Sequence, residues 1–134
     1  MGWLGKLLGL EAEPHAVVSV SDANYKAEVL DSELPVLLDV WSDGCGPCKM
    51  LEPVVMDLSR KYKGRLRVAE MNVANGPKTA RKLGVSATPT VLYFHKGRVV
   101  ERVVGYRAGH YHQTFLEQEL LPKAAPERAQ AAKP

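Results

Sequence analysis

The stretch that decides the fold reads Val36-Leu-Leu-Asp-Val-Trp-Ser-Asp-Gly-Cys-Gly-Pro-Cys-Lys-Met50. Its first six residues form a nearly continuous apolar run, which is typical of a central strand buried on both faces. Ser42 to Cys48 then turns the chain into a helix, because Pro47 suits a first helical turn and an apolar stripe follows it. The stripe consists of Met50, Leu51, Val54, Val55 and Leu58. A buried strand that turns into an amphipathic helix predicts an α/β domain.

The elements on either side of this stretch alternate between strand and helix. Strands are predicted near residues 17–20, 66–73, 91–95 and 99–104, and helices over 22–30, 78–83 and 109–121. Ser21 and Asp22 are N-cap candidates for the first helix. Pro53 is expected to kink the helix that contains it. The last two strands pair through a tight turn at Lys96-Gly97, so we expect a mixed sheet with helices on both faces.

Three residues of the opening stretch carry chemistry. Asp39 lies within the apolar strand, and Cys45 and Cys48 lie at the start of the helix. Helix N-terminal amides stabilise negative charge, so Cys45 is well placed to be a reactive thiolate. Cys48 lies close enough to form a disulfide after attacking a mixed disulfide made by Cys45. If Asp39 is desolvated behind the helix, its pKa is raised and it can accept the Cys48 proton.

Two other interpretations fit the same residues. A lone Cys-x-x-Cys can be half of a zinc site, with His15, His95, His110 and His112 available as further ligands. Zinc is the weaker interpretation, because His110 and His112 point to different faces of a helix and no second Cys-x-x-Cys exists, so no metal is expected. Asp39 could also be a core carboxylate without a catalytic role.

Length and composition fit one globular domain. The chain has 134 residues, of which 46% are hydrophobic and 25% charged, which is enough to bury a core. Two cysteines are too few for a disulfide-stapled mini-protein. Residues 60–107 hold 12 Lys and Arg against 2 Asp and Glu. These cations are spread over several elements with no nucleic-acid-binding motif, so we expect no nucleic-acid partner and favour a solvated face or one that docks acidic proteins.

The domain is placed at residues 17–121, with an extension at each end. In the N-terminal extension, residues 1–16, four apolar side chains would share one face of a helix: Trp3, Leu4, Leu7 and Leu8. No signal-peptide cleavage site follows, and no stretch reaches the length of a membrane span. We therefore expect a cytoplasmic protein. Residues 122–134 are rich in Ala, Pro and charge and are predicted to form a flexible tail.

The segment Asp39–Met50 is highly specific, and further matches lie at Pro53, Thr88-Pro89-Thr90, Gly97 and Gly105. Together these residues resemble the thioredoxin family over about residues 17–121. The resemblance implies the thioredoxin fold, a central mixed five-stranded sheet flanked by four helices in the order βαβαβαββα. It also implies a protein-disulfide reductase.

The same resemblance assigns roles to individual residues. Cys45 is expected to attack the substrate disulfide and Cys48 to resolve the mixed disulfide, so that the two form the redox-active disulfide. Asp39 matches a buried proton-transfer carboxylate, and Trp41 an aromatic residue that packs beside the redox loop. The other residues expected in this loop are Gly44, Gly46, Pro47 and Lys49.

Substrate recognition is expected on a second loop. Pro89 matches a cis-proline that faces the cysteines, which would leave the backbone of Thr88 free to pair with an extended substrate peptide. Gly105 and Tyr106 are expected to border the substrate groove. By the same resemblance, no cofactor is bound, electrons come from NADPH through a thioredoxin reductase, the substrates are proteins with disulfides, and the protein is a monomer.

Two positions depart from the family pattern. Gly44 stands where typical members carry a second tryptophan, so the docking of partners is expected to differ. Glu70 stands where many bacterial members carry lysine, and a carboxylate near Asp39 would raise the pKa of Asp39 further. Gly44 and the two extensions keep one alternative open, a dedicated redox partner of one protein. The basic residues 60–107 or the N-terminal apolar segment keep another open, a thioredoxin-fold binding or chaperone-like module.

Overall fold

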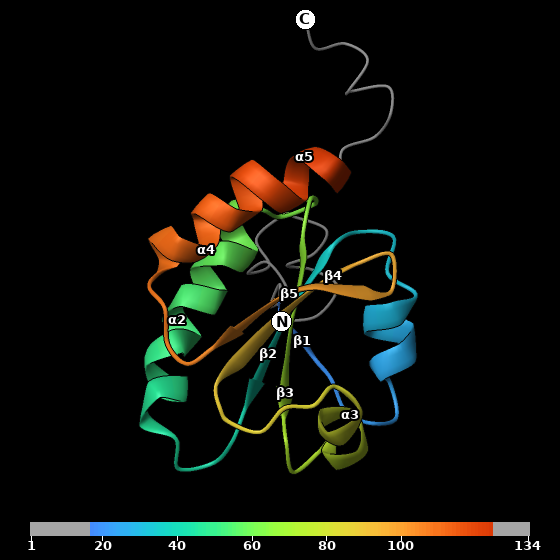
Figure 1. Ribbon diagram of the computed structural model, residues 1–134, viewed down its shortest axis with the longest axis vertical. Coiled ribbons are helices and arrows are strands. Elements are labelled where there is room, and N and C mark those ends of the chain that lie inside the picture. The colour runs from blue at the N-terminus through green and yellow to red at the C-terminus, as the bar shows by residue number, and fades with distance from the viewer. Residues whose placement is uncertain (1–16, 125–134) are drawn as a thin grey trace, which may run out of the picture.

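The computed structural model describes residues 17–124, which form a five-stranded sheet covered by helices (Figure 1). The elements are β1 (Val17–Ser19), η1 (Lys26–Leu30), β2 (Val36–Trp41), α2 (Gly46–Lys61), β3 (Arg67–Asn72), α3 (Pro77–Lys82), β4 (Thr90–His95), β5 (Arg98–Val104), α4 (Gly109–Phe115), η2 (Leu116–Leu120) and α5 (Leu121–Ala124). The strand order is β1-β3-β2-β4-β5. β1, β3 and β2 are parallel, while β4 is antiparallel to both β2 and β5. The predicted mixed sheet is confirmed.

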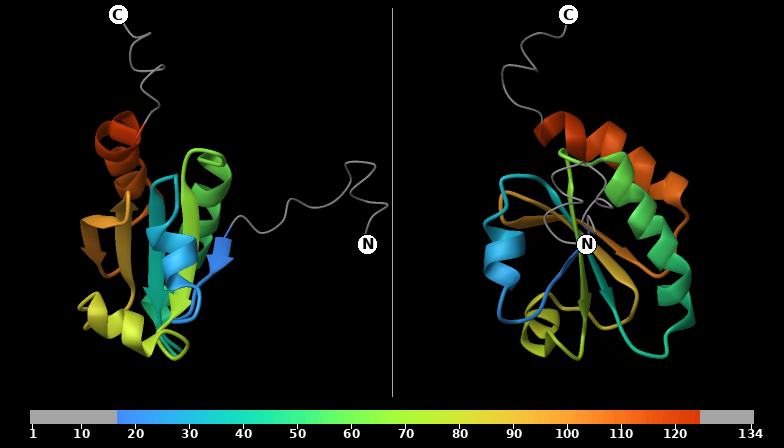
Figure 2. Two further views of the ribbon diagram at one scale, coloured as in Figure 1. Left: turned by 90° about the vertical axis from the view of Figure 1, so that its right-hand side faces the viewer. Right: turned by 180° about the vertical axis from the view of Figure 1, so that it is seen from behind.

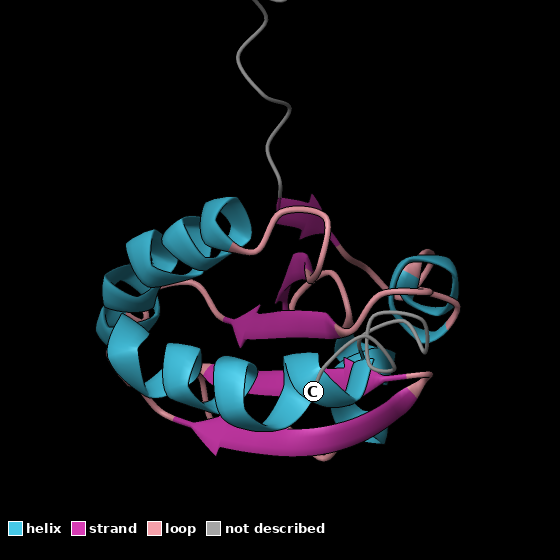
Figure 3. Cartoon of the chain, turned by 90° about the horizontal axis from the view of Figure 1, so that it is seen from above, coloured by secondary structure: helices cyan, strands magenta, loops and turns pink. Residues whose placement is uncertain are grey.

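A separate hydrophobic core lies on each face of the sheet. α2 and the consecutive C-terminal helices α4, η2 and α5 cover one face, where Leu51 and Leu116 pack with Tyr93. η1 and α3 cover the other face, where Val29 and Ala80 pack against the strands. Figure 2 shows the two groups of helices toward opposite sides, and Figure 3 shows the strands between them. Because both faces are covered, β2 is buried from Val36 to Val40, as its apolar sequence predicts.

The first helix begins later than predicted, and Asp22, one of its two N-cap candidates, has another function. Helical structure is assigned from Lys26 rather than from residue 22. The carboxylate of Asp22 accepts hydrogen bonds from the backbone N–H groups of Lys78 and Thr79, at 3.1 and 2.8 Å. These are first-turn amides of α3, whose own N-cap is a glycine without a side chain. Asp22 therefore caps α3 across the fold.

The boundaries of the domain also differ from the prediction at the C-terminus. The C-terminal helices continue to Ala124, so the first three residues of the predicted tail are helical. The rest of that tail and the N-terminal extension, residues 1–16, lie outside the described residues. α2 runs without interruption through Pro53. Within residues 17–124, no helix is long and apolar enough to cross a membrane.

Candidate redox site

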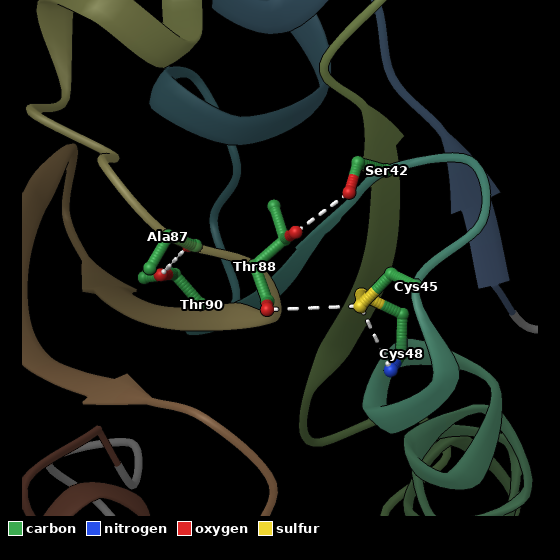
Figure 4. Close-up of a disulfide and its surroundings, with 6 residues drawn as sticks. All are labelled: Ser42, Cys45, Cys48, Ala87, Thr88 and Thr90. Carbon is green, nitrogen blue, oxygen red and sulfur yellow. Dashed lines mark hydrogen bonds between the residues drawn. A yellow bond between two sulfur atoms is a disulfide. The ribbon is translucent and has the colours of Figure 1, made fainter.

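The two cysteines lie at the start of α2, which follows β2 after a short loop. Cys45 is the N-cap residue of α2, and it forms a disulfide with Cys48 across a Cα–Cα distance of 5.3 Å (Figure 4). The backbone N–H of Cys48 donates a hydrogen bond to Sγ of Cys45 at 3.2 Å. Cys45 is partly exposed, whereas Cys48 is buried. Cys45 therefore places its sulfur at the positive end of a helix with access to solvent, as the sequence predicts.

A second loop faces the disulfide from the start of β4. The Thr88–Pro89 peptide bond is cis, and the carbonyl oxygen of Thr88 lies 3.6 Å from Sγ of Cys45. The backbone N–H of Gly105 donates to the carbonyl oxygen of Pro89 at 2.8 Å. Tyr106 follows and is 38% exposed. The structure thus places the backbone of Thr88 opposite Cys45, and that of Gly105 against Pro89.

Ser42 joins these two loops, and the sequence did not single it out. Its hydroxyl is hydrogen-bonded to the hydroxyl of Thr88 at 2.6 Å (Figure 4). The Thr90 hydroxyl donates to the carbonyl oxygen of Ala87 at 2.6 Å and closes the turn around the proline. Ser42 and Thr88 are 46 residues apart. No local pattern predicts this pair, because only the fold brings the two hydroxyls together.

Asp39 lies beneath α2 and is 5% exposed. Its Oδ1 has no hydrogen-bond partner within the described part of the chain. Burial raises the pKa of Asp39 to about 7, and the carboxylates of Glu70 and Glu52 add to the increase. A cavity of about 550 Å³ is lined by both Asp39 and Cys48. Asp39 therefore shares a space with the buried cysteine and is basic enough to exchange a proton near neutral pH.

Trp41 and Glu70 line the same cavity and are joined to each other. The indole Nε1 of Trp41 donates a hydrogen bond to Oε1 of Glu70 at 2.6 Å. The sequence marked each residue separately but did not predict this contact. The contact follows from the register of β2 and β3. In that register Asp39 is paired with Glu70, and Trp41 lies two residues after Asp39 on the same strand.

Gly44 has a backbone conformation that favours glycine. It has φ +72, and no heavy atom lies within 4 Å of a Cβ built on it. A tryptophan there would therefore meet no steric obstacle at Cβ, but it would have to adopt the left-handed conformation, which L side chains rarely do. Gly46, Pro47 and Lys49 are exposed around the cysteines.

A zinc site would need other ligating side chains beside the two cysteines. Within residues 17–124, no three His, Cys, Asp or Glu side chains are grouped to hold a metal ion. His110 is exposed and His112 is buried, with Nδ1 of His112 2.7 Å from the phenol oxygen of Tyr93. His15 lies outside the described residues. His112 is thus a core residue hydrogen-bonded to a neighbouring strand.

The two cysteine sulfurs differ in exposure and lie at a helix N-terminus, opposite a cis-proline. Such a pair performs dithiol–disulfide exchange, and the protein is therefore of the thiol–disulfide oxidoreductase class. The family model described as Thioredoxin matches residues 16–118. The thioredoxin of Synechocystis sp. is 47% identical over 90 residues, which cover 67% of this chain and 84% of that protein. The thioredoxin of Pseudomonas aeruginosa is 36% identical over 104 residues, covering 78% and 96%. The chain belongs to the thioredoxin family and is a disulfide reductase of that family.

Proposed function

We propose that Cys45 is the nucleophile and Cys48 the resolving thiol in the reduction of protein disulfides. The observation that carries this assignment is the hydrogen bond from the Cys48 backbone N–H to Sγ of Cys45. In the reduced protein this N–H and the helix N-terminus favour a thiolate on Cys45. Cys48 is buried, which disfavours its thiolate until a nearby base takes the proton.

The exchange takes place in two steps. The Cys45 thiolate attacks one sulfur of the substrate disulfide, so a Cys45–substrate bond forms, the substrate S–S bond breaks and the other substrate sulfur leaves as a thiolate. Cys48 then loses its proton and attacks Sγ of Cys45, which releases the second substrate thiolate and forms the Cys45–Cys48 disulfide. Two electrons pass from the protein to the substrate.

In this proposal Asp39 accepts the Cys48 proton. A carboxylate with a pKa of about 7 is a stronger base than an ordinary aspartate, so it approaches the basicity of a thiolate. The cavity that Asp39 shares with Cys48 supports the transfer. We further propose that the substrate lies across Thr88, Pro89, Gly105 and Tyr106, with its backbone paired to Thr88.

The reaction needs a source of electrons. We propose that a thioredoxin reductase returns them from NADPH to the Cys45–Cys48 disulfide, so that the protein takes part in electron transport and redox homeostasis. A reducing compartment suits this cycle, and we propose the cytoplasm.

Insulin reduction in the presence of a thioredoxin reductase and NADPH tests the assignment. Cys45→Ser and Cys48→Ser should each abolish multiple turnover, and Ser59→Ala, a change on α2 away from the sulfurs, is the matched control. The sequence contains only two cysteines, so residual activity has no other thiol to account for it. Full turnover in either cysteine variant would contradict the assignment, whereas insulin reduction by none of the proteins would favour a partner-binding or chaperone-like module.

A further inference from the structure

Glu70 touches two parts of the site at once. In the parallel ladder it is paired with Asp39, so both side chains project to the same face of the sheet, beneath α2. Its Oε1 also accepts the indole N–H of Trp41 at 2.6 Å. All three residues line the cavity that reaches Cys48. The carboxylate is therefore fixed between the redox-loop strand and the buried acid.

We propose that Trp41 and Glu70 form a positioning pair that links the redox loop to the proton acceptor. The indole N–H holds the Glu70 carboxylate beside Asp39, and a displacement of the indole changes how firmly Asp39 holds its proton. The inference rests on the proposed role of Asp39 in the exchange. It adds a route by which contact at the redox loop prepares that residue.

The charges around Asp39 favour Glu70 as the group that exerts this effect. Glu70 approaches from β3, and Glu52 and Lys49 approach from α2, while Asp43 lies in the loop between β2 and α2. After burial, Glu70 is the larger of the two carboxylate contributions that raise the pKa of Asp39. Glu52 is exposed and screened by solvent, whereas Glu70 is half-buried and held by a hydrogen bond.

The direction of the coupling follows from like-charge repulsion. While the indole holds Glu70 in place, the neighbouring negative charge favours the protonated form of Asp39. When a docked partner shifts the indole, the Glu70 carboxylate is free to turn toward solvent and the repulsion weakens. Asp39 then releases its proton to solvent through the cavity. Burial still keeps the pKa of Asp39 above its ordinary value, so the resulting carboxylate is ready to accept the proton of Cys48 in the resolving step.

The test follows the titration of the Asp39 carboxyl carbon by NMR in the full-length, oxidised protein. No substrate or reductase is present, so a failure here is distinct from a failure of the proposed function. Glu70→Gln keeps an acceptor for the indole and removes the charge, and should lower the Asp39 midpoint by about one pH unit. Trp41→Phe keeps an aromatic ring and removes the donor, and should lower the midpoint by a smaller amount.

The double variant tests whether Trp41 acts on Asp39 through Glu70. In the Glu70→Gln background, Trp41→Phe should produce no further shift, because the held charge is already gone. Glu52→Gln is the matched control: it removes a carboxylate of the same cavity that has no bond to the indole, and it should leave the Trp41→Phe shift intact. An equal Trp41→Phe shift with and without Glu70, or an unchanged midpoint in Glu70→Gln, would overturn the proposal.

Discussion

Asp39 on β2 is paired with Glu70 on β3, so two carboxylates face the same space beneath α2. Asp39 is 5% exposed, and burial together with Glu70 and Glu52 raises its pKa to about 7. The ordinary value for an aspartate is about 3.9. The folded protein therefore disfavours the ionised form of Asp39 over the pH range in which the unfolded chain has already lost that proton.

The free energy of unfolding should accordingly vary with pH as Asp39 gains or loses its proton. As pH rises from about 4 to about 7, the unfolded state releases the Asp39 proton first, so stability falls and then levels off. Asp39→Asn cannot ionise and should be more stable than the wild type at pH 8 by up to ~4 kcal/mol, with little difference near pH 4. Urea unfolding of the oxidised proteins at the two pH values measures this. The same difference at both values would show that Asp39 does not ionise against burial.

His112 should produce a slope of the opposite sign. It is 1% exposed, and burial followed by the charge of Arg107 lowers its pKa to about 4. As pH falls from about 6.5 to about 4, only the unfolded chain takes up the proton, so the free energy of unfolding should fall by up to ~3 kcal/mol.

His112→Asn tests that slope, because the amide keeps a polar atom near the position that hydrogen-bonds to Tyr93. Both proteins are compared in the Asp39→Asn background, which removes the opposing titration. The slope between pH 6.5 and pH 5, above the range in which Glu117 contributes, should disappear with His112→Asn. A slope that persists would assign it to another group.

The two glycines on either side of Cys45 should respond differently to alanine. Gly44 has a left-handed φ of +72, whereas Gly46 begins α2 without a positive φ, and neither has a heavy atom within 4 Å of a built Cβ. Gly44→Ala should therefore reduce the free energy of unfolding by about 1 kcal/mol through backbone strain alone. Gly46→Ala should be neutral or slightly stabilising. Denaturant unfolding of the two variants makes the comparison, and equal effects would contradict the conformational explanation for Gly44.

The sequence predicted those parts of the fold that local patterns encode. The apolar run of β2, the turn into α2 and the sequence Cys45-Gly-Pro-Cys48 have clear local signatures, and the structure contains each of them. Asp22 shows where local reasoning fails. Its residue type and position are those of an N-cap for the next helix. It caps α3 instead, because a cap needs the right geometry and not proximity in sequence.

The same limit applies within the site. Asp39, Cys45 and Pro89 carry their own signatures, but the Ser42–Thr88 and Trp41–Glu70 hydrogen bonds join residues 46 and 29 positions apart. Such contacts depend on strand order and register, which the sequence leaves open until the sheet is assembled. The sequence shows that Glu70 is unusual at its position, but it does not show that Glu70 is hydrogen-bonded to Trp41.

Trapping of the mixed disulfide tests the assignment of Cys45 most directly. Reduced Cys48→Ser and Cys45→Ser are each mixed with a disulfide-containing protein, and the covalent complexes are identified by non-reducing mass spectrometry. Cys48→Ser should accumulate a complex joined through Cys45, because the partly exposed thiolate attacks and no resolving thiol remains. Cys45→Ser should accumulate little or none, because Cys48 is buried. A complex that forms as fast through Cys48 as through Cys45 would contradict the assignment.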